Sequence, residues 1–317
     1  MAELEQEQKG KKRSVQMGVK LGPLTLKNPI IAVAGTCGIG DAYAPFSFPE
    51  ELGAITTPTL TPQPLVGLPQ PRMHEVRGGI LHATGGQNPG VEAFVLQDLP
   101  RLKTYKMTVI ASIGGNSIEE FCHVARVLAT SDVDAVELNT SCMCSELGHA
   151  FGADPDAIQR LCLAVRAETD KPMLVKLMPR VTDISLCAEA AQDGGAQVLS
   201  LVGAFPAMLL DVNTGKSVLG AEQLRLSGAA IFPQALHAVY EARRATKLPI
   251  LGMGGVTTAN DAIQMMMVGA NAVGLGSAVF AQPTLAETIK RELQRYCQER
   301  GIRQVSKLTN AFLESQM

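Results

Sequence analysis

The fold is decided by the stretch Ala135-Val136-Glu137-Leu138-Asn139-Thr140-Ser141-Cys142, a short apolar run that ends in polar residues and a thiol. Such a run, bounded by helical patterns, predicts a parallel strand that is buried on both faces. Cys142 then lies just past the carboxyl end of this strand, and glycine-bearing residues 148–155 follow before the next helix. In a barrel of alternating strands and helices, catalytic groups gather at this end of the strands. The thiol is therefore a candidate acid, base or nucleophile.

The same pattern recurs along the chain. Eight short apolar runs alternate with amphipathic stretches, which predicts an α/β protein with the architecture of a TIM (β/α)8 barrel. The expected strands are Pro29–Ala34, Ala54–Leu60, Met107–Ile113, Ala135–Asn139, Met173–Leu177, Val198–Val202, Ile250–Met253 and Ala272–Gly276. The clearest helical stretches are Ser117–Ala129, Asp156–Thr169, Asp183–Gln192, Ala230–Thr246 and Thr258–Val268.

Two segments add to the barrel. Val19–Leu26 has Gly-Pro at its centre, which predicts a hairpin that closes the bottom of the barrel. Gly203–Ser227 is a long segment after the sixth strand without a clear helical pattern, and long loops at the carboxyl face usually build active sites. We expect residues 1–14 to be a disordered charged tail, 15–300 to form the barrel and 301–317 to be a C-terminal extension.

Composition excludes several classes of protein. The 317 residues carry a net charge of −2, contain no Trp and are only 4% aromatic, which argues against a nucleic-acid binder. No apolar run reaches the ~18 residues that a membrane span needs. Residues 1–13 lack the apolar core of a signal peptide. The seven cysteines show no paired spacing, which favours reduced thiols and a cytoplasmic location.

Glycines follow the last two predicted strands. The segments are Gly252-Met253-Gly254-Gly255-Val256 and Gly274-Leu275-Gly276-Ser277-Ala278. Backbone amides at these two places in a barrel often hold a phosphate, and a Cβ atom would block its close approach. The alternative is that the glycines only form strand-to-helix turns.

Polar residues at the ends of two other strands are further candidates. Lys176 lies in an apolar strand, where it needs a partner or a cavity, so it either stabilises negative charge on a bound ring or forms a structural ion pair. Asn139 can bond a ring or a substrate, or it can simply support a turn. Cys142 and Cys144 alone do not satisfy the spacing of a metal site. Cys37 comes just after the first strand, which can place it on the same face of the barrel as Cys142. We expect the helical thiols to be core residues; these are Cys122, Cys162, Cys187 and Cys297.

From about Val19 to Ala281 these segments resemble the dihydroorotate dehydrogenase family, and most closely its class 1B catalytic subunit. The segments that carry the resemblance are Lys27–Ile31, Gln87–Gly90, Glu137–Cys142, Gly148–Pro155, Val175–Leu177, Leu226–Gly228, Gly252–Gly255 and Gly276–Ser277. The resemblance implies a TIM barrel with FMN at its carboxyl face. It also implies a homodimer and a second subunit that carries FAD and a [2Fe-2S] cluster.

The resemblance assigns a role to individual residues. The catalytic cysteine of the family corresponds to Cys142, which would exchange a proton with the substrate. The FMN-binding positions correspond to Ala34, Gly35, Thr59, Asn139, Lys176, Val202, Gly228, Gly254, Gly255, Gly276 and Ser277. The substrate-binding positions correspond to His82, Gly85, Gly86, Cys144 and Gly203.

Several of these positions depart from the family pattern. The family's lysine on the second strand falls at Pro58, and the Asn of its substrate loop falls at His82. The Pro-Asn pair after the cysteine is Met143-Cys144 here, and the Asn-Thr pair after the sixth strand is Gly203-Ala204. Each lost hydrogen bond to a polar substrate costs ~1–3 kcal/mol, so together these changes predict the loss of ordinary affinity for orotate unless His82 and other groups substitute.

Three hypotheses follow. The first is an FMN oxidoreductase that acts on a C–C bond beside a carbonyl, in a substrate other than dihydroorotate, with His82 as a ligand of the substrate, as a second acid, or only as a hydrogen-bonded loop residue. The second is a dihydroorotate dehydrogenase with remodelled contacts. The third is a non-catalytic flavin-binding subunit, against which the thiol of Cys142 argues.

Overall fold

The computed structural model describes residues 14–46, 48–141 and 151–316. Eight parallel strands form a closed barrel in which each strand pairs with the next one along the chain and the last pairs with the first. These strands are β3 (Ile30–Ala32), β4 (Ala54–Thr56), β7 (Thr108–Ile113), β8 (Ala135–Asn139), β9 (Met173–Lys176), β10 (Val198–Leu201), β15 (Ile250–Met253) and β16 (Ala272–Leu275). Each lies within a predicted run, so the prediction of a TIM barrel is confirmed.

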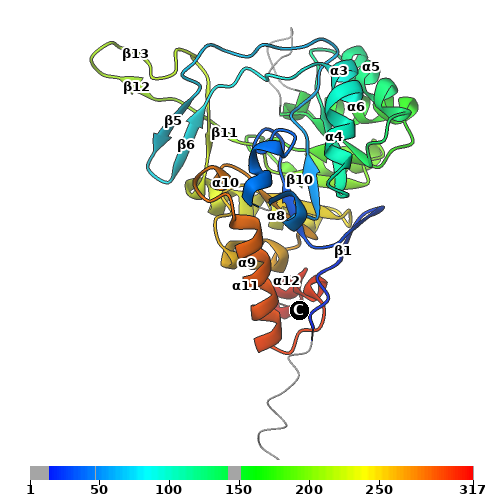
Figure 1. Cartoon of the computed structure of the whole chain (residues 1–317). Coiled ribbons are helices and arrows are strands. Elements are labelled where there is room, and N and C mark those ends of the chain that lie inside the picture. The colour runs from blue at the N-terminus through cyan, green and yellow to red at the C-terminus, as the bar shows by residue number, and fades with distance from the viewer. Residues whose placement is uncertain (1–13, 47, 142–150, 317) are drawn as a thin grey trace, which may run out of the picture.

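Helices surround the barrel (Figure 1). Sequence signals set where they begin: the Ser117 side chain accepts a hydrogen bond from Glu120 N at 3.2 Å, and Thr258 forms a capping box with Asp261. The longer helices are α5 (Ile118–Ala129), α6 (Pro155–Glu168), α7 (Ile184–Asp193), α8 (Phe232–Ala245), α9 (Ala259–Met267) and α11 (Leu285–Glu299). The shorter ones are η1 (Asp41–Phe46), α2 (Phe48–Glu51), α3 (Val91–Ala93), η2 (Phe94–Asp98), α4 (Leu99–Lys103), η3 (Phe151–Ala153), η4 (Ala229–Ile231), α10 (Ala278–Ala281), η5 (Val305–Leu308) and α12 (Ala311–Ser315).

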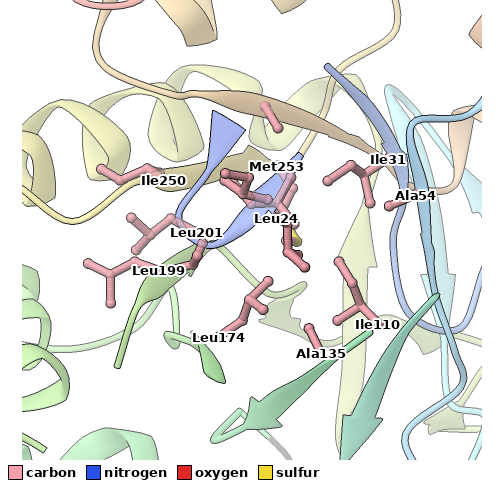
Figure 2. Packing of buried hydrophobic residues seen from close by; sticks show 14 of the residues in the cluster. Leu24, Ile31, Ala54, Ile110, Ala135, Leu174, Leu199, Leu201, Ile250 and Met253 are labelled. Carbon is pink, nitrogen blue, oxygen red and sulfur yellow. The ribbon is translucent and has the colours of Figure 1, made fainter. Parts of the chain in front are cut away.

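The interior of the barrel is apolar and is closed at the amino ends of its strands. Ile110 and Leu174 are fully buried inside it, and Leu24 lies among these side chains (Figure 2). Leu24 belongs to the hairpin of β1 (Val19–Leu21) and β2 (Leu24–Leu26). A Cβ atom on Gly22, at the hairpin turn, would lie 2.9 Å from the Gln197 carbonyl just before β10. The prediction that this hairpin closes the bottom of the barrel is therefore confirmed.

An inserted sheet stands beside the barrel. It consists of β5 (Met73–Val76), β6 (Gly79–His82), β11 (Phe205–Ala207) and β14 (Leu224–Ser227), in the antiparallel order β11-β14-β6-β5. With the small hairpin β12 (Leu210–Asp211) and β13 (Lys216–Ser217), it extends to the upper left in Figure 1. No strands were predicted in these two segments. The strands are short, and although β5 and β6 form a local hairpin, the hairpin is completed by β14, which is far away in the sequence.

The inserted sheet has a small core of its own. Leu81, Ala83, Leu219 and Leu224 are buried together, apart from the main core of the barrel.

At the other end of the molecule, Gln16 forms a β-bridge with Gln304, which ties the start of the described chain to the C-terminal segment. Within the described ranges, every helix is too short or too polar to cross a bilayer. The domain limits at residues 15 and 300 stay a prediction.

Candidate active site

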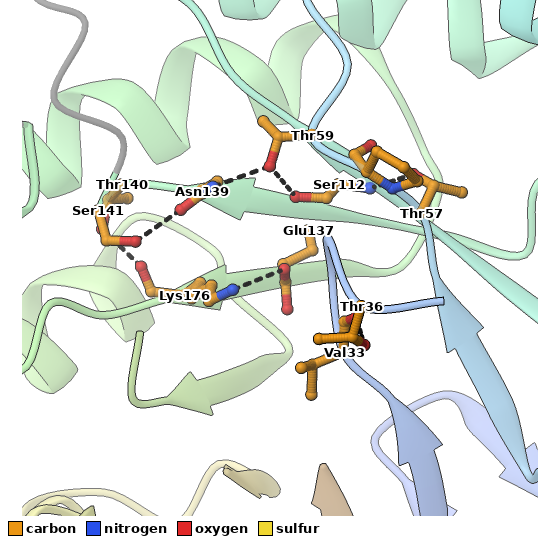
Figure 3. Close-up of polar contacts among 11 residues, drawn as sticks. Val33, Thr36, Thr57, Thr59, Ser112, Glu137, Asn139, Thr140, Ser141 and Lys176 are labelled. Atoms are coloured by element: carbon orange, nitrogen blue, oxygen red, sulfur yellow. Dashed lines mark hydrogen bonds and ion pairs between the residues drawn. The ribbon is translucent and has the colours of Figure 1, made fainter. Parts of the chain in front are cut away.

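A row of hydrogen-bonded side chains lines the carboxyl ends of β7 and β8. Asn139 Nδ2 donates to Thr59 Oγ1 at 2.8 Å, and Ser141 Oγ donates to Asn139 Oδ1 at 2.7 Å (Figure 3). Thr59 Oγ1 lies 3.0 Å from Ser112 Oγ and continues the row. These bonds fix the orientation of the Asn139 amide. Because an amide offers two protons and two lone pairs, it can still bond one further group at each end.

Lys176 lies beside this row as half of a buried ion pair. Its Nζ is 4.0 Å from Glu137 Oε1, and the side chains are only 10% and 1% exposed. Among the described residues, neither carboxylate oxygen of Glu137 has a hydrogen-bond partner. The structural ion pair considered as the alternative for Lys176 is therefore present. Because the separation exceeds hydrogen-bond length, Glu137 attracts the ammonium by charge and does not accept a hydrogen bond from it.

Gly203 brings the end of β10 against the same residues. A Cβ atom on Gly203 would lie 3.0 Å from Ser141 Oγ and 3.8 Å from Lys176 Cε. Thr140 Oγ1 donates to the Lys176 carbonyl at 2.6 Å and joins β8 to β9 at this level. Five candidates from the sequence, Thr59, Asn139, Lys176, Val202 and Gly203, thus lie at the same end of neighbouring barrel strands.

Glycines form a cradle between β15 and the start of α8. Gly254 and Gly255 have φ values of +114° and +74°, and Gly228 has a φ of +121°. A Cβ atom on Gly255 would lie 2.6 Å from Phe232 N, the first residue of α8. No side chain caps the first residues of η4 or α8. The first N–H groups of a helix can bind a phosphate, and glycines beside them leave room for it because they carry no side chain. These glycines therefore fit the phosphate group of FMN.

The other predicted cofactor residues surround this end of the barrel. Ser277 begins α10 directly after Gly276, where a Cβ atom would lie 3.7 Å from Val33 Cγ2. Ala34 is half-buried, and Gly35 is exposed with a φ of +84° and open space around it. We call Gly228, Gly254, Gly255 and Gly276 the glycine cradle.

His82 faces the site from the inserted sheet. Its Nε2 lies 3.2 Å from Ser227 Oγ, and the ring is half-buried. Burial, followed by the positive charges of Arg225 and Lys176, lowers the pKa of His82 to about 4. The imidazole is therefore neutral near pH 7, which fits a hydrogen-bond role and does not fit a charged acid.

Four further candidates are Gly85, Gly86, Cys142 and Cys144. The atoms closest to a Cβ on Gly85 are Leu68 N and the Leu68 side chain, and Gly86 faces Leu65, so both glycines lie along the loop of residues 65–68. Cys142 and Cys144 are outside the described residues. Cys37 is buried, and burial raises the pKa of its thiol to about 12, which makes it unreactive. The helical Cys122, Cys162, Cys187 and Cys297 are buried free thiols.

Arg225 was not among the residues predicted from the sequence. Its Nη2 donates to the Ser141 carbonyl at 3.2 Å, so a residue of the inserted sheet reaches the residue just before Cys142. No motif identified it, because the pairing of β14 with β6 joins residues 145 positions apart. The available signal was a charged residue between two leucines, Leu224 and Leu226, which indicates a strand with one polar face.

Comparison with known proteins adds a family match. Residues 16–297 match the family described as dihydroorotate dehydrogenase. The chain is 39% identical over 295 residues to the protein named dihydroorotate dehydrogenase B (NAD(+)), catalytic subunit, of Thermoanaerobacter pseudethanolicus, which covers 93% of this chain and 98% of that one. It is 40% identical over 299 residues to the protein of the same name from Desulforudis audaxviator, with 94% and 97% covered.

Proposed function

The chain belongs to the dihydroorotate dehydrogenase family, and from this we propose that it transfers hydride between FMN and a C–C bond beside a carbonyl, with Cys142 as the acid or base. Enzymes of this family are FMN-dependent oxidoreductases that act on CH–CH groups. The observation that supports the proposal most directly is that the glycine cradle and the pair Asn139–Lys176 lie at the same end of one barrel.

The described residues suggest how FMN is held. The glycine cradle, with Ser277 and the start of α8, would bind the phosphate through backbone N–H groups. Thr59, Asn139 and Lys176 would contact the ring by hydrogen bonds, and Ala34, Gly35 and Val202 would flank it. When bound, FMN would supply the group that accepts or donates the hydride.

The protein's own residues would supply the charge and the proton. Lys176 would stabilise negative charge at the ring, and the buried carboxylate of Glu137 lies 4.0 Å from its Nζ as the opposite charge. Ser141 is held by hydrogen bonds with Asn139 and Arg225, and it positions the chain just before Cys142. From there the thiol of Cys142 would remove a proton from, or return one to, the carbon beside the carbonyl.

Dihydroorotate is the substrate that the comparisons favour. Relatives named for this activity match nearly the whole chain at about 40% identity. A second candidate is another unsaturated carbonyl compound, and the residues at Pro58, His82 and Gly203 favour it. Gly203 has no side chain to bond a substrate, although it lies beside Ser141 and Lys176.

We also propose the partners of the enzyme. The relatives are named catalytic subunits, which supports a second subunit that passes electrons to NAD(+). By resemblance that subunit would carry FAD and a [2Fe-2S] cluster. A homodimer and a cytoplasmic location stay predictions from the sequence.

The test of the substrate is an anaerobic flavin spectrum of the purified protein, recorded before and after addition of dihydroorotate. If dihydroorotate is the substrate, the flavin band bleaches within the time of a turnover. A yellow protein that stays oxidised would contradict this assignment and favour the second candidate. A colourless protein that cannot be loaded with FMN would contradict the proposed function itself.

A further inference from the structure

Glu137 is an acid that points into the barrel. Side chains alternate along a strand, so Glu137 lies on the same side of β8 as Ala135, which packs with the apolar side chains of the interior (Figure 2). Charged side chains are almost never fully buried unless they are paired. Among the residues that the structure describes, Glu137 and Lys176 are the two charged side chains that are buried, and they lie on the neighbouring strands β8 and β9.

The described surroundings of this carboxylate supply an opposite charge and no hydrogen bond. Neither of its oxygens has a hydrogen-bond partner in the part of the chain that the structure describes. Ser112, which lies opposite Glu137 on β7, directs its hydroxyl to Thr59. Lys176 Nζ is 4.0 Å from Glu137 Oε1 (Figure 3). Because a buried acid that only stabilised the fold would be expected to accept hydrogen bonds, we attribute the role of this carboxylate to its charge.

That charge bears on the place where FMN would be bound. The residues that follow β4, Thr57-Pro58-Thr59, are uncharged, so the buried charges of the barrel strands are those of Glu137 and Lys176. A flavin ring that takes up two electrons and one proton gains one negative charge. The ammonium of Lys176 favours this reduced form, whereas the carboxylate of Glu137 opposes it. Both effects are strong in a buried place, because little water screens the charges.

We propose that Glu137 lowers the reduction potential of bound FMN by offsetting the charge of Lys176. Glu137 is a positioning residue, because it acts through the lysine and is assigned no contact with FMN or the substrate. A lower potential makes reduced FMN a stronger hydride donor and shifts the equilibrium of hydride transfer towards the reduced substrate. This inference rests on the proposed function, because that function places FMN beside Lys176.

The experiment measures the reduction potential of bound FMN. The FMN-loaded protein is reduced without oxygen at pH 7 beside a reference dye of known potential, and absorption spectra give the ratio of reduced to oxidised flavin. Glu137→Gln removes the charge and keeps the shape of the side chain. We expect it to raise this ratio about tenfold at a fixed potential, since one neighbouring charge changes an ionisation equilibrium by about tenfold or more. For a two-electron couple, tenfold corresponds to about 30 mV.

Two further variants separate charge from structure. Glu137→Asp keeps the charge and shortens the side chain, so we expect the ratio to stay within about threefold of the wild-type value. Glu168→Gln is the matched control, because it removes the same charged group from a partly exposed pair with Arg126. Solvent screens that pair, so the ratio should change by less than about twofold. If Glu137→Gln does not retain FMN, the substitution is added to Lys176→Met, where it should again raise the ratio.

Three results would overturn the inference. The first is a ratio in Glu137→Gln, or in its combination with Lys176→Met, that is unchanged or lower. The second is an equal rise in Glu137→Asp, which would show that the shape of the side chain matters and its charge does not. The third is an equal rise in Glu168→Gln. All three leave the proposed function intact, because they are measured on protein that binds FMN. A chain that cannot be loaded with FMN would contradict the proposed function and this inference together.

Discussion

The candidate site has two walls of different construction. The first is the set of barrel strand ends that carry Asn139, Lys176 and the glycine cradle, and it is joined to the main core. The second is the inserted sheet with His82 and Arg225, which has a small separate core. The barrel wall carries the features that suit FMN together with the departures at Pro58 and Gly203, whereas the inserted sheet carries the departure at His82. Residues from two separately packed parts of the fold therefore meet at the candidate site.

Replacing the proposed acid or base of the barrel wall should have the largest effect. In Cys142→Ser we expect turnover to fall by ~100-fold or more, the usual scale of general acid–base catalysis, while FMN remains bound. The rate of flavin reduction, measured by stopped flow per bound FMN, checks this. Cys37→Ser is the control, because that thiol is buried with a pKa of about 12. Similar rates in the two variants would remove Cys142 from the mechanism.

Breaking the buried ion pair tests whether the barrel wall also contributes to the free energy of unfolding. In Lys176→Met we expect a loss of about 3 kcal/mol in the free energy of unfolding, because Glu137 is left buried without its cation. Adding Glu137→Gln should restore much of this loss, and urea denaturation of both variants measures it. Lys103→Met removes a half-exposed pair with Asp134 and should cost less than about 1 kcal/mol. A double variant as unstable as the single one would contradict this account.

Adding one methyl group to the glycine cradle tests whether it binds FMN. In Gly255→Ala the new Cβ would lie 2.6 Å from Phe232 N at a φ of +74°, so we expect FMN to bind about tenfold more weakly, or about 1.4 kcal/mol. Gly215→Ala has a similar φ of +63° with open space around it, and it should lose only the backbone strain. FMN titration by fluorescence measures both. Unchanged affinity in Gly255→Ala would place the phosphate elsewhere.

His82 should give the inserted sheet a pH dependence. The pKa of this histidine is lowered to about 4 in the folded protein, against about 6.5 when unfolded. Below pH 6.5 the unfolded chain binds a proton that the folded one does not, so stability falls as the pH is lowered from about 6.5 towards 4. Between pH 7.5 and 5.5 we expect a loss of about 1 kcal/mol from this residue.

The variant His82→Gln isolates this contribution. It should lose less stability than the wild-type protein over the same pH range, because glutamine does not titrate. Urea denaturation at several pH values measures the difference. Equal slopes in the two proteins would mean that the ring is not held neutral by its burial beside Arg225 and Lys176.

The sequence predicted the barrel wall well, because the patterns that identify its strands lie within short stretches of the chain. An apolar run buried on both sides is visible in Ala135–Asn139, and the barrel geometry then places residues such as Asn139 and Lys176 at one end. The closing hairpin was equally visible from Gly-Pro at its turn. Whether Lys176 has an ionic partner was left open, because Glu137 and Lys176 belong to different strands.

The inserted sheet was not predicted, although β5 and β6 form a local hairpin, because the pairing that joins this hairpin to β14 is not local. β6 and β14 are short and are separated by much of the barrel, so neither segment shows a strand pattern that is distinct from a loop. The lowered pKa of His82 follows from this pairing and from the burial it brings. Arg225 could be seen as a charged residue between leucines, but its contact with Ser141 required the fold.

The hairpin that closes the amino end of the barrel limits how ligands can reach the candidate site. Because Leu24 lies within the packed interior, the residues that the structure describes close the amino end of the barrel, and a ligand of Lys176 would approach from the carboxyl ends of the strands. Two ligands that share a one-ended passage enter one after the other and leave in the reverse order. With FMN bound at Lys176 and the substrate nearer the mouth of the barrel, FMN would therefore leave only after the substrate.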